Sequence, residues 1–245
     1  MKNKNIIFGT RPVLEAIKSG KTIERIFIQK NINKDIIQEI KILGKKFKLN
    51  ISLVPKEKLN RITKKNHQGI ISYISPISYQ PIDEIILRTY EKGKDPIIII
   101  LDKITDTRNL GSISRVAEAV EVDAIVIPKK GSALITSDAI KTSAGALNYV
   151  PVCKVESLNY ICKTLKKNGL KIISCTEKGG EDVYKLDYNY PLAIIFGSEK
   201  DGISQSLLEL SDNKVKIPMY GKIDSLNVSN SASVILYEII RQRLF

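Results

Sequence analysis

The sequence is poor in the residues that several common kinds of active site require. Its 245 residues include no tryptophan, one histidine and three cysteines, and aromatic residues make up only 6%. Cys153, Cys162 and Cys175 leave an odd count and form no C-x-x-C pair, so with a single histidine they predict no zinc site. This cysteine usage favours the reducing cytoplasm as the location of the protein.

Long apolar runs and the common nucleotide motifs are also missing. The longest aliphatic runs, residues 97–101 and 192–196, have five residues each, whereas a membrane-spanning helix needs roughly 18. The basic N-terminus is not followed by the apolar stretch of a secretory signal, so we expect a soluble protein with no membrane partner. The absence of G-x-G-x-x-G excludes the usual dinucleotide fingerprint. A Ser-His-Asp site would need His67, which we interpret as a structural residue or an RNA contact.

What the sequence does contain is a strong asymmetry of charge. The net charge is +13, and residues 1–76 alone carry 17 basic against 5 acidic side chains, which is +12. Residues 77–245 are almost neutral at +1. A charge gathered in one third of the chain indicates a polyanionic partner for that third, and nucleic acid is the preferred interpretation. The alternative is a lysine-rich compositional bias, although a bias would not spare the other two thirds.

Residues 1–75 alternate between strand-like and helix-like segments, which predicts a small α/β domain. The expected helices cover residues 11–18, 33–47 and 56–63, and the expected strands cover 23–29, 50–54 and 69–74. Prolines and an irregular pattern predict a linker over residues 76–95.

Residues 96–245 predict a second α/β domain with a mainly parallel sheet. Short strands that are apolar on both faces, separated by helical stretches, are typical of a sheet covered on both sides. They are expected at residues 97–101, 124–127, 172–175, 192–196 and 215–217. Apolar residues from Val228 to Ile240 then recur at helical spacing and predict a final amphipathic helix.

Two loops after these strands carry unusual residues, at the edge where such sheets bind ligands. In the first loop, Asn109 and Arg115 flank Gly111, which we expect to open a helix; the structural alternative is an asparagine cap and a surface arginine. In the second, Gly197 directly follows a buried strand, so that another backbone or a flat ligand can approach closely. Its spacing to Gly202 is that of a P-loop, but the lysine that such a loop needs is missing.

A third loop leads into the final helix through residues 216–221 and 225–229. Its polar groups would serve a binding site, or they would simply cap the helix.

Together the three loops resemble the motifs of SpoU-type RNA 2′-O-ribose methyltransferases of the SPOUT superfamily. The matching residues are Asn109-x-Gly111-x-x-x-Arg115, Gly197-Ser198-Glu199-x-x-Gly202, and Ile217-Pro218-Met219 with Ser225-Leu226-Asn227-Val228-Ser229. Residues 141–146 resemble an intervening element of the family, and residues 9–16 and 66–70 resemble its substrate-binding domain. The resemblance covers about the whole chain.

The resemblance implies a fold, a cofactor and a set of site residues. The C-terminal domain would be knotted as a deep trefoil and would form a homodimer through the knot, with a small α/β RNA-binding domain in front of it. S-adenosyl-L-methionine would bind in the knot, held largely through the backbone of Gly197, Ile217 and Leu226, and no metal is implied. The catalytic residues would be Asn109, Arg115, Glu199, Ser225 and Asn227.

Arg115 is proposed as the base in this family, but a guanidinium has a pKa above about 12, so clamping a phosphate and stabilising the alkoxide is a safer role.

The resemblance also indicates the RNA substrate. A basic domain in front of the knot is most similar to enzymes that methylate a guanosine of 23S rRNA. The alternatives are a tRNA ribose methyltransferase of the same family and a non-catalytic RNA-binding or ribosome-assembly protein that kept the fold. Ser112, Ser114 and Asn230 depart from the family's usual residues without touching the matched catalytic positions.

Overall fold

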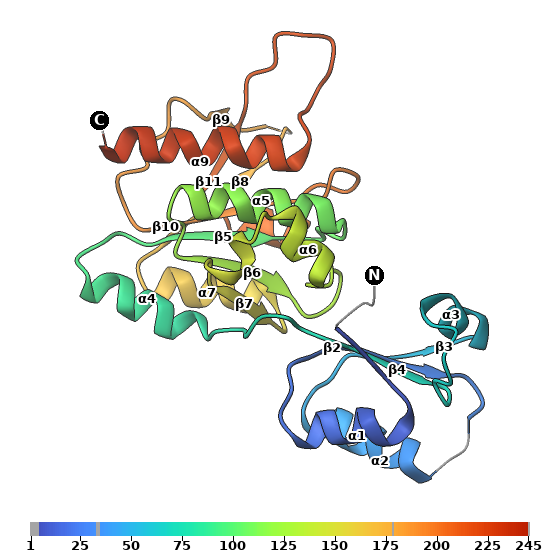
Figure 1. The fold of residues 1–245 in the computed structure, drawn as a ribbon. Helices are drawn as coiled ribbons and strands as arrows, with labels where there is room; N and C mark the ends of the chain where they lie inside the picture. The colour runs from blue at the N-terminus through green and yellow to red at the C-terminus, as the bar shows by residue number, and fades with distance from the viewer. Residues whose placement is uncertain (1–4, 33–34, 178, 245) are drawn as a thin grey trace. The chain divides into compact units, whose positions relative to one another are not determined.

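The computed structural model describes residues 5–32, 35–177 and 179–244. The chain forms two compact units, and the main division between them falls between Ser78 and Tyr79 (Figure 1). Among the described residues, no helix combines the length and apolar character needed to cross a membrane.

The first unit is a four-stranded mixed sheet with three helices. Its strands have the order β1-β4-β2-β3, in which β2 runs parallel to β3 and antiparallel to β4, and β1 runs antiparallel to β4. The strands are β1 (Ile6–Phe8), β2 (Ile23–Gln29), β3 (Ile51–Val54) and β4 (Ile70–Ile74), and the helices are α1 (Thr10–Lys18), α2 (Asp35–Lys46) and α3 (Lys56–Ile62). Each element expected from the sequence is present, although residues 33 and 34 of the expected second helix lie outside the described residues. The three-residue strand β1 was not expected.

The two faces of this sheet are covered unequally. Ile26 and Ile28 of β2 are fully buried against α1 and α2, whereas Phe27, between them, belongs to a smaller cluster beneath α3. The alternation follows from the strand's two-residue period. The larger core therefore lies on the α1 and α2 side.

The second unit is a seven-stranded sheet of order β7-β6-β5-β10-β8-β11-β9, and every pairing between neighbouring strands is parallel. The strands are β5 (Ile97–Leu101), β6 (Ala124–Pro128), β7 (Val152–Val155), β8 (Lys171–Cys175), β9 (Glu181–Asp182), β10 (Leu192–Phe196) and β11 (Asn213–Lys216). The helices are α4 (Ile82–Glu91), α5 (Thr107–Ala119), α6 (Ser137–Thr142), the short 3-10 helix η1 (Ala146–Asn148), α7 (Leu158–Lys167), α8 (Gln205–Leu210) and α9 (Val228–Leu244).

Helices cover both faces of this sheet, as the apolar strands predicted. Side chains of α4, α7 and α8 pack on one face, around Ile98, Ile100 and Ile195. Helices α5 and α9 lie side by side on the other face (Figure 1). All five residues of β5 and of β10 are buried. Burial of each such isoleucine contributes about 1.5–3 kcal/mol, so the two central strands are a rigid base for the loops that follow them.

The structure corrects three details of the sequence interpretation. The last strand covers residues 213–216, not 215–217, and strands β7 and β9 were missed. The segment 76–95, interpreted as a linker, contains α4, and Ile82, Ile85 and Ile86 of this helix are buried in the core of the second unit.

Candidate functional site

The three loops singled out in the sequence lie at one edge of the second sheet. Leu101 pairs with Phe196, Phe196 with Cys175, and Cys175 with Val215, so the carboxyl ends of β5, β10, β8 and β11 are in register. Because parallel strands place their carboxyl ends at one edge, loops more than 100 residues apart in sequence start next to one another.

Helix α5 presents the first loop's asparagine. Asp106 is the N-cap, and its carboxylate accepts a 2.7 Å hydrogen bond from the backbone N–H of Arg108. The helix therefore begins at Thr107, and Gly111 does not open it, contrary to expectation. Gly111 lies inside the helix, where a Cβ atom would come within 3.0 Å of the Thr142 side chain. Its role is the close approach of α5 to the segment that resembles the family's intervening element.

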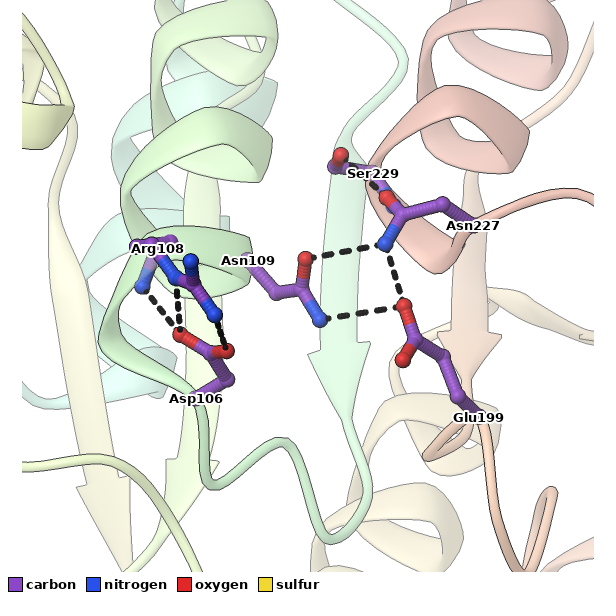
Figure 2. A network of polar contacts seen from close by, with 6 residues as sticks. All are labelled: Asp106, Arg108, Asn109, Glu199, Asn227 and Ser229. Atoms are coloured by element: carbon purple, nitrogen blue, oxygen red, sulfur yellow. Dashed lines mark hydrogen bonds and ion pairs between the residues drawn. The ribbon is translucent and has the colours of Figure 1, made fainter.

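A polar network joins the three loops (Figure 2). Asn109 donates from Nδ2 to Glu199 Oε1 at 3.3 Å, and Asn227 donates from Nδ2 to Asn109 Oδ1 at 3.1 Å and to Glu199 Oε1. Asn227 Oδ1 in turn accepts the backbone N–H of Ser229 at 2.9 Å, in the first turn of α9. Asn227 thus caps the helix with its oxygen, which confirms the capping interpretation, and enters the network with its nitrogen.

A cavity of about 430 Å³ opens beside the network. Four of the residues that line it were singled out in the sequence: Gly197, Ile217, Ser225 and Leu226. Glu199 also lines it, which places one side of the network at the rim of the cavity. The volume lies in the range of small-molecule sites, and the mixture of backbone, apolar and polar groups is typical of such sites.

Gly197 is required by the loop that it begins. A Cβ atom at this position would lie within 3.0 Å of the backbone of Gly202 and Ile203. The loop closes on itself there, because the Gly202 N–H donates to the Ser198 carbonyl at 2.9 Å and the Asp201 N–H donates to Ser198 Oγ at 3.0 Å. The close approach expected at this glycine is therefore made by the loop's own backbone.

Asp102 is a positioning residue that sequence reasoning missed. It directly follows β5 with 6% of its surface exposed, and its Oδ2 accepts the N–H of Ser204 at 2.7 Å. This bond ties the first loop to the end of the second, where α8 starts. The available signal was a carboxylate placed directly after a fully apolar strand.

Comparison with known proteins identifies the family. Residues 96–237 match the model of the SpoU rRNA Methylase family, and residues 6–80 match the RNA 2′-O ribose methyltransferase substrate-binding domain. A Staphylococcus saprophyticus relative, named as a TrmH family tRNA/rRNA methyltransferase, is 39% identical over 97% of this chain and 96% of its own length. The chain belongs to the SpoU methylase family.

Solved structures of SpoU-type proteins share the fold. The SpoU methyltransferase AviRb from Streptomyces viridochromogenes, solved with AdoMet, aligns with a TM-score of 0.63 at 23% identity, over 98% of this chain and 90% of its own. A structure described as an RNA 2′-O ribose methyltransferase aligns with a TM-score of 0.58 at 25% identity, over 98% and 89%.

Arg115, which the resemblance led us to expect among the catalytic residues, lies outside the network. Its side chain is exposed on α5, and it has no hydrogen bond or ion pair within residues 5–32, 35–177 and 179–244. Six residues separate it from Asn109, so at 3.6 residues per turn the two side chains leave the helix in different directions. The neighbouring Arg108 is paired with Asp106 at 3.1 Å, and its hydrogen bonds lower the pKa of the Asp106 carboxyl.

The single histidine belongs to the first unit and is structural. His67 is 6% exposed, its Nδ1 accepts the Gly69 N–H at 3.0 Å, and its Nε2 lies 2.9 Å from Asn60 Oδ1. Burial, followed by the nearby Lys56, lowers its pKa. No group of three or more His, Cys, Asp or Glu side chains that would hold a metal ion occurs in the part of the chain that the structure describes.

Proposed function

We propose that the protein transfers a methyl group from S-adenosyl-L-methionine to a ribose 2′-oxygen of RNA, with a guanosine of 23S rRNA as the favoured target. The observation that carries the proposal is the joining of Asn109, Glu199 and Asn227 into one network at the rim of the 430 Å³ cavity. These are three of the five residues matched to the family's catalytic positions. A fourth, Ser225, lines the cavity itself.

The cavity's residues fit the methyl donor. Ile217 and Leu226 supply an apolar wall for an adenine ring, and the loop begun by Gly197 presents backbone groups instead of side chains. When bound, S-adenosylmethionine supplies a methyl group already activated on a sulfonium sulfur. The protein's share of the work is then mainly to position the acceptor, which is a large effect in group transfer.

The acceptor ribose would be oriented by the network and by Arg115. The amides of Asn109 and Asn227 hold Oε1 of the Glu199 carboxylate at the cavity's rim, and its Oε2 would accept a hydrogen bond from the ribose hydroxyl. The guanidinium of Arg115 would clamp the substrate phosphate and stabilise the negative charge that develops on the 2′-oxygen. Its exposed position on α5 suits contact with a macromolecular substrate.

The homodimer and the trefoil knot complete the proposal. The third loop, which would form part of the knot, exposes Tyr220 at 95% and Ile223 at 73% of their surfaces. Large apolar side chains exposed together on one loop favour coverage by another protein surface, and a second copy of this chain is the occupant that the family resemblance implies. We place this activity in the cytoplasm, as the cysteine usage suggested.

The decisive experiment maps the methylated atom. Purified protein and labelled S-adenosylmethionine are offered unmodified 23S rRNA and unmodified tRNA, and the labelled nucleotide is identified. We expect label on a ribose 2′-oxygen of 23S rRNA, seen as resistance of the next phosphodiester bond to alkali. Label on a base would overturn the mechanism, and label on tRNA alone would keep the mechanism and replace the substrate.

A variant separates a catalyst from a binding protein. Arg115→Ala should abolish methylation and leave the affinity for S-adenosylmethionine unchanged, because Arg115 does not line the cavity. Arg88→Ala, which removes an exposed arginine of α4, is the matched control and should retain full activity. Absence of methylation by the unaltered protein, with RNA binding intact, would favour the non-catalytic alternative.

A further inference from the structure

One segment of the first unit concentrates positive charge without any neutralising partner. Residues 56–65, which are α3 and the start of the loop after it, carry five basic side chains and one carboxylate, that of Glu57. All five basic side chains are exposed: Lys56, Lys58, Arg61, Lys64 and Lys65. None of them forms an ion pair within the residues that the structure describes. We call residues 56–65 the α3 basic segment.

The other helical face of the same unit is different. Helix α2 with the three residues after it, residues 35–49, has two carboxylates beside four lysines, so its net charge is +2, compared with +4 for the α3 basic segment over the same extent. Glu39 also pairs with Lys18 of α1 at 3.0 Å. The excess charge of the unit is therefore not spread evenly over its surface.

Aromatic rings of the sheet hold the α3 basic segment in place. Lys58 Nζ lies 4.9 Å from the centre of the Phe27 ring, and Lys65 Nζ lies 5.8 Å from that of Phe8. Leu59, which lies between these two lysines in the sequence, is fully buried in the small cluster beneath α3. Cation–π contacts of this kind fix the position of an ammonium group while leaving its charge accessible.

The arrangement is electrostatically unfavourable until an anion arrives. Lys58 and Arg61 are three residues apart on a seven-residue helix, where like charges destabilise the helix, and the Pro55 cap offers no side-chain hydrogen bond. A polyanion would relieve this repulsion. An RNA backbone carries a charge at every phosphate, and its binding to lysine and arginine is driven by the release of counterions.

We propose that the α3 basic segment is the main RNA-contacting surface of the first unit and that it takes the backbone phosphates of the substrate. The proposal rests on the proposed function for the identity of the polyanion, and it goes further by assigning the contact to one helix and one loop. The α1 and α2 face contributes only the general attraction of a basic domain.

The test compares two sets of three charges in the full-length protein. Lys56→Gln, Arg61→Gln and Lys64→Gln are combined in one variant, which spares the two lysines over aromatic rings. Lys41→Gln, Lys45→Gln and Lys46→Gln on α2 form the control, with the same loss of charge from exposed positions. Binding of unmodified 23S rRNA, and in a second arm of tRNA, is measured by filter binding over a series of KCl concentrations.

The α3 variant should lose at least tenfold in RNA affinity, and the slope of log affinity against log salt should fall by about 2–3, because three phosphate contacts are removed. In the α2 control, the slope should fall by less than about one third as much as in the α3 variant. The charge-preserving variant Lys56→Arg, Arg61→Lys, Lys64→Arg should keep the full slope, which shows that a loss in the first variant is one of charge and not of folding.

The outcomes separate this proposal from the function itself. Equal losses in the α3 and α2 variants, or no loss in the α3 variant, would overturn the assigned surface while methylation by the unaltered protein stands. Normal α3-dependent binding with no methylation of either RNA would support the surface and remove the proposed function.

Discussion

The two units of this protein use polar residues in opposite ways. In the first unit, the five basic side chains of the α3 basic segment form no ion pair with any described residue, and residues 1–76 together carry a net charge of +12. In the second unit, which is nearly neutral, the polar groups that matter are joined to one another, as in the network of Asn109, Glu199 and Asn227. Unpaired charge suits a partner that varies in shape and is attracted from a distance, whereas a joined network suits one defined geometry.

The two units also differ in how their sheets are covered. The carboxyl edge of the second unit lies on β5 and β10, whose residues are buried on both faces, and so the three loops start from fixed positions. The first unit has a larger core on the α1 and α2 side of its sheet and a smaller cluster beneath α3. The two units should therefore respond to different changes, and each prediction below affects one unit and spares the other.

The largest effect is expected from Asn227→Asp. The new carboxylate still accepts the Ser229 N–H and caps α9, but it loses both donated hydrogen bonds and places a negative charge beside Glu199. Removing one positioned donor costs about 10²–10³-fold in rate in comparable sites, so methylation should fall by at least that factor, measured by incorporation of label into RNA. RNA affinity and its salt dependence, which we assign mainly to the α3 basic segment, should change little.

Asn230→Asp is the matched control, since it makes the same change at an exposed position on the same helix. It should leave the methylation rate within about twofold. If Asn227→Asp retains full activity, the network is only a means of capping α9, and the site would have to be sought elsewhere along the cavity.

The second effect is expected from Gly197→Ala. Its methyl group would meet the backbone of Gly202 and Ile203, which cannot move aside as a side chain can. The free energy of unfolding of the second unit should fall by about 1–3 kcal/mol, and the affinity for S-adenosylmethionine should fall at least tenfold. Denaturant unfolding and calorimetric titration measure the two quantities.

Gly221→Ala provides the comparison, because a Cβ atom there has no neighbour within 4 Å and the residue is not in the left-handed region. This variant should bind the methyl donor normally. A wild-type affinity in Gly197→Ala would mean that the second loop can rearrange, and it would remove Gly197 from the cofactor site.

The sequence predicted the central strands of both sheets and the edge strand β3, but it missed three other short edge strands. Strands β1, β7 and β9 each lie at an end of their sheet. Strand β1 has only three residues and β9 only two, which is too short for a period to be recognised, and Lys154 interrupts the apolar residues of the four-residue strand β7. The start of β11 was misplaced by two residues, because Asn213 and Lys214 are polar and gave no apolar signal.

The site residues were predictable only as separate motifs. The sequence identifies Asn109, Glu199 and Asn227 through the family resemblance, but their hydrogen bonds link positions up to 118 residues apart, and no local pattern encodes them. Asp102 was missed because its partner, Ser204, lies 102 residues away. The charge of residues 56–65 was visible in the sequence, whereas its lack of ion pairs and its anchoring on Phe27 and Phe8 depend on how the sheet folds.

The smallest effect is a pH dependence confined to the first unit. The Nδ1 atom of His67 accepts the Gly69 N–H, so the neutral ring carries its proton on Nε2 and donates it to Asn60 Oδ1. Protonation of Nδ1 would set two donors against each other, and burial and Lys56 oppose it as well, which is why the pKa is lowered from 6.5. The folded state therefore prefers the neutral ring. Its stabilising contribution is complete above the unfolded pKa of about 6.5 and is lost as the pH falls through the folded pKa, with a slope of at most about 1.4 kcal/mol per pH unit for one proton.

His67→Asn tests this assignment, because the asparagine oxygen can replace Nδ1 as the acceptor for Gly69 and does not titrate. The difference in unfolding free energy between the unaltered protein and this variant should shrink as the pH is lowered from about 7.5 to about 5.5. Since His67 is the only histidine, no other imidazole contributes to the difference. The affinity of the second unit for S-adenosylmethionine, measured over the same range, should be equal in the two proteins. A difference in stability that stays constant with pH would mean that the ring titrates alike in the folded and unfolded chains. The hydrogen bonds of His67 to Asn60 and Gly69 would then contribute nothing that depends on its protonation state.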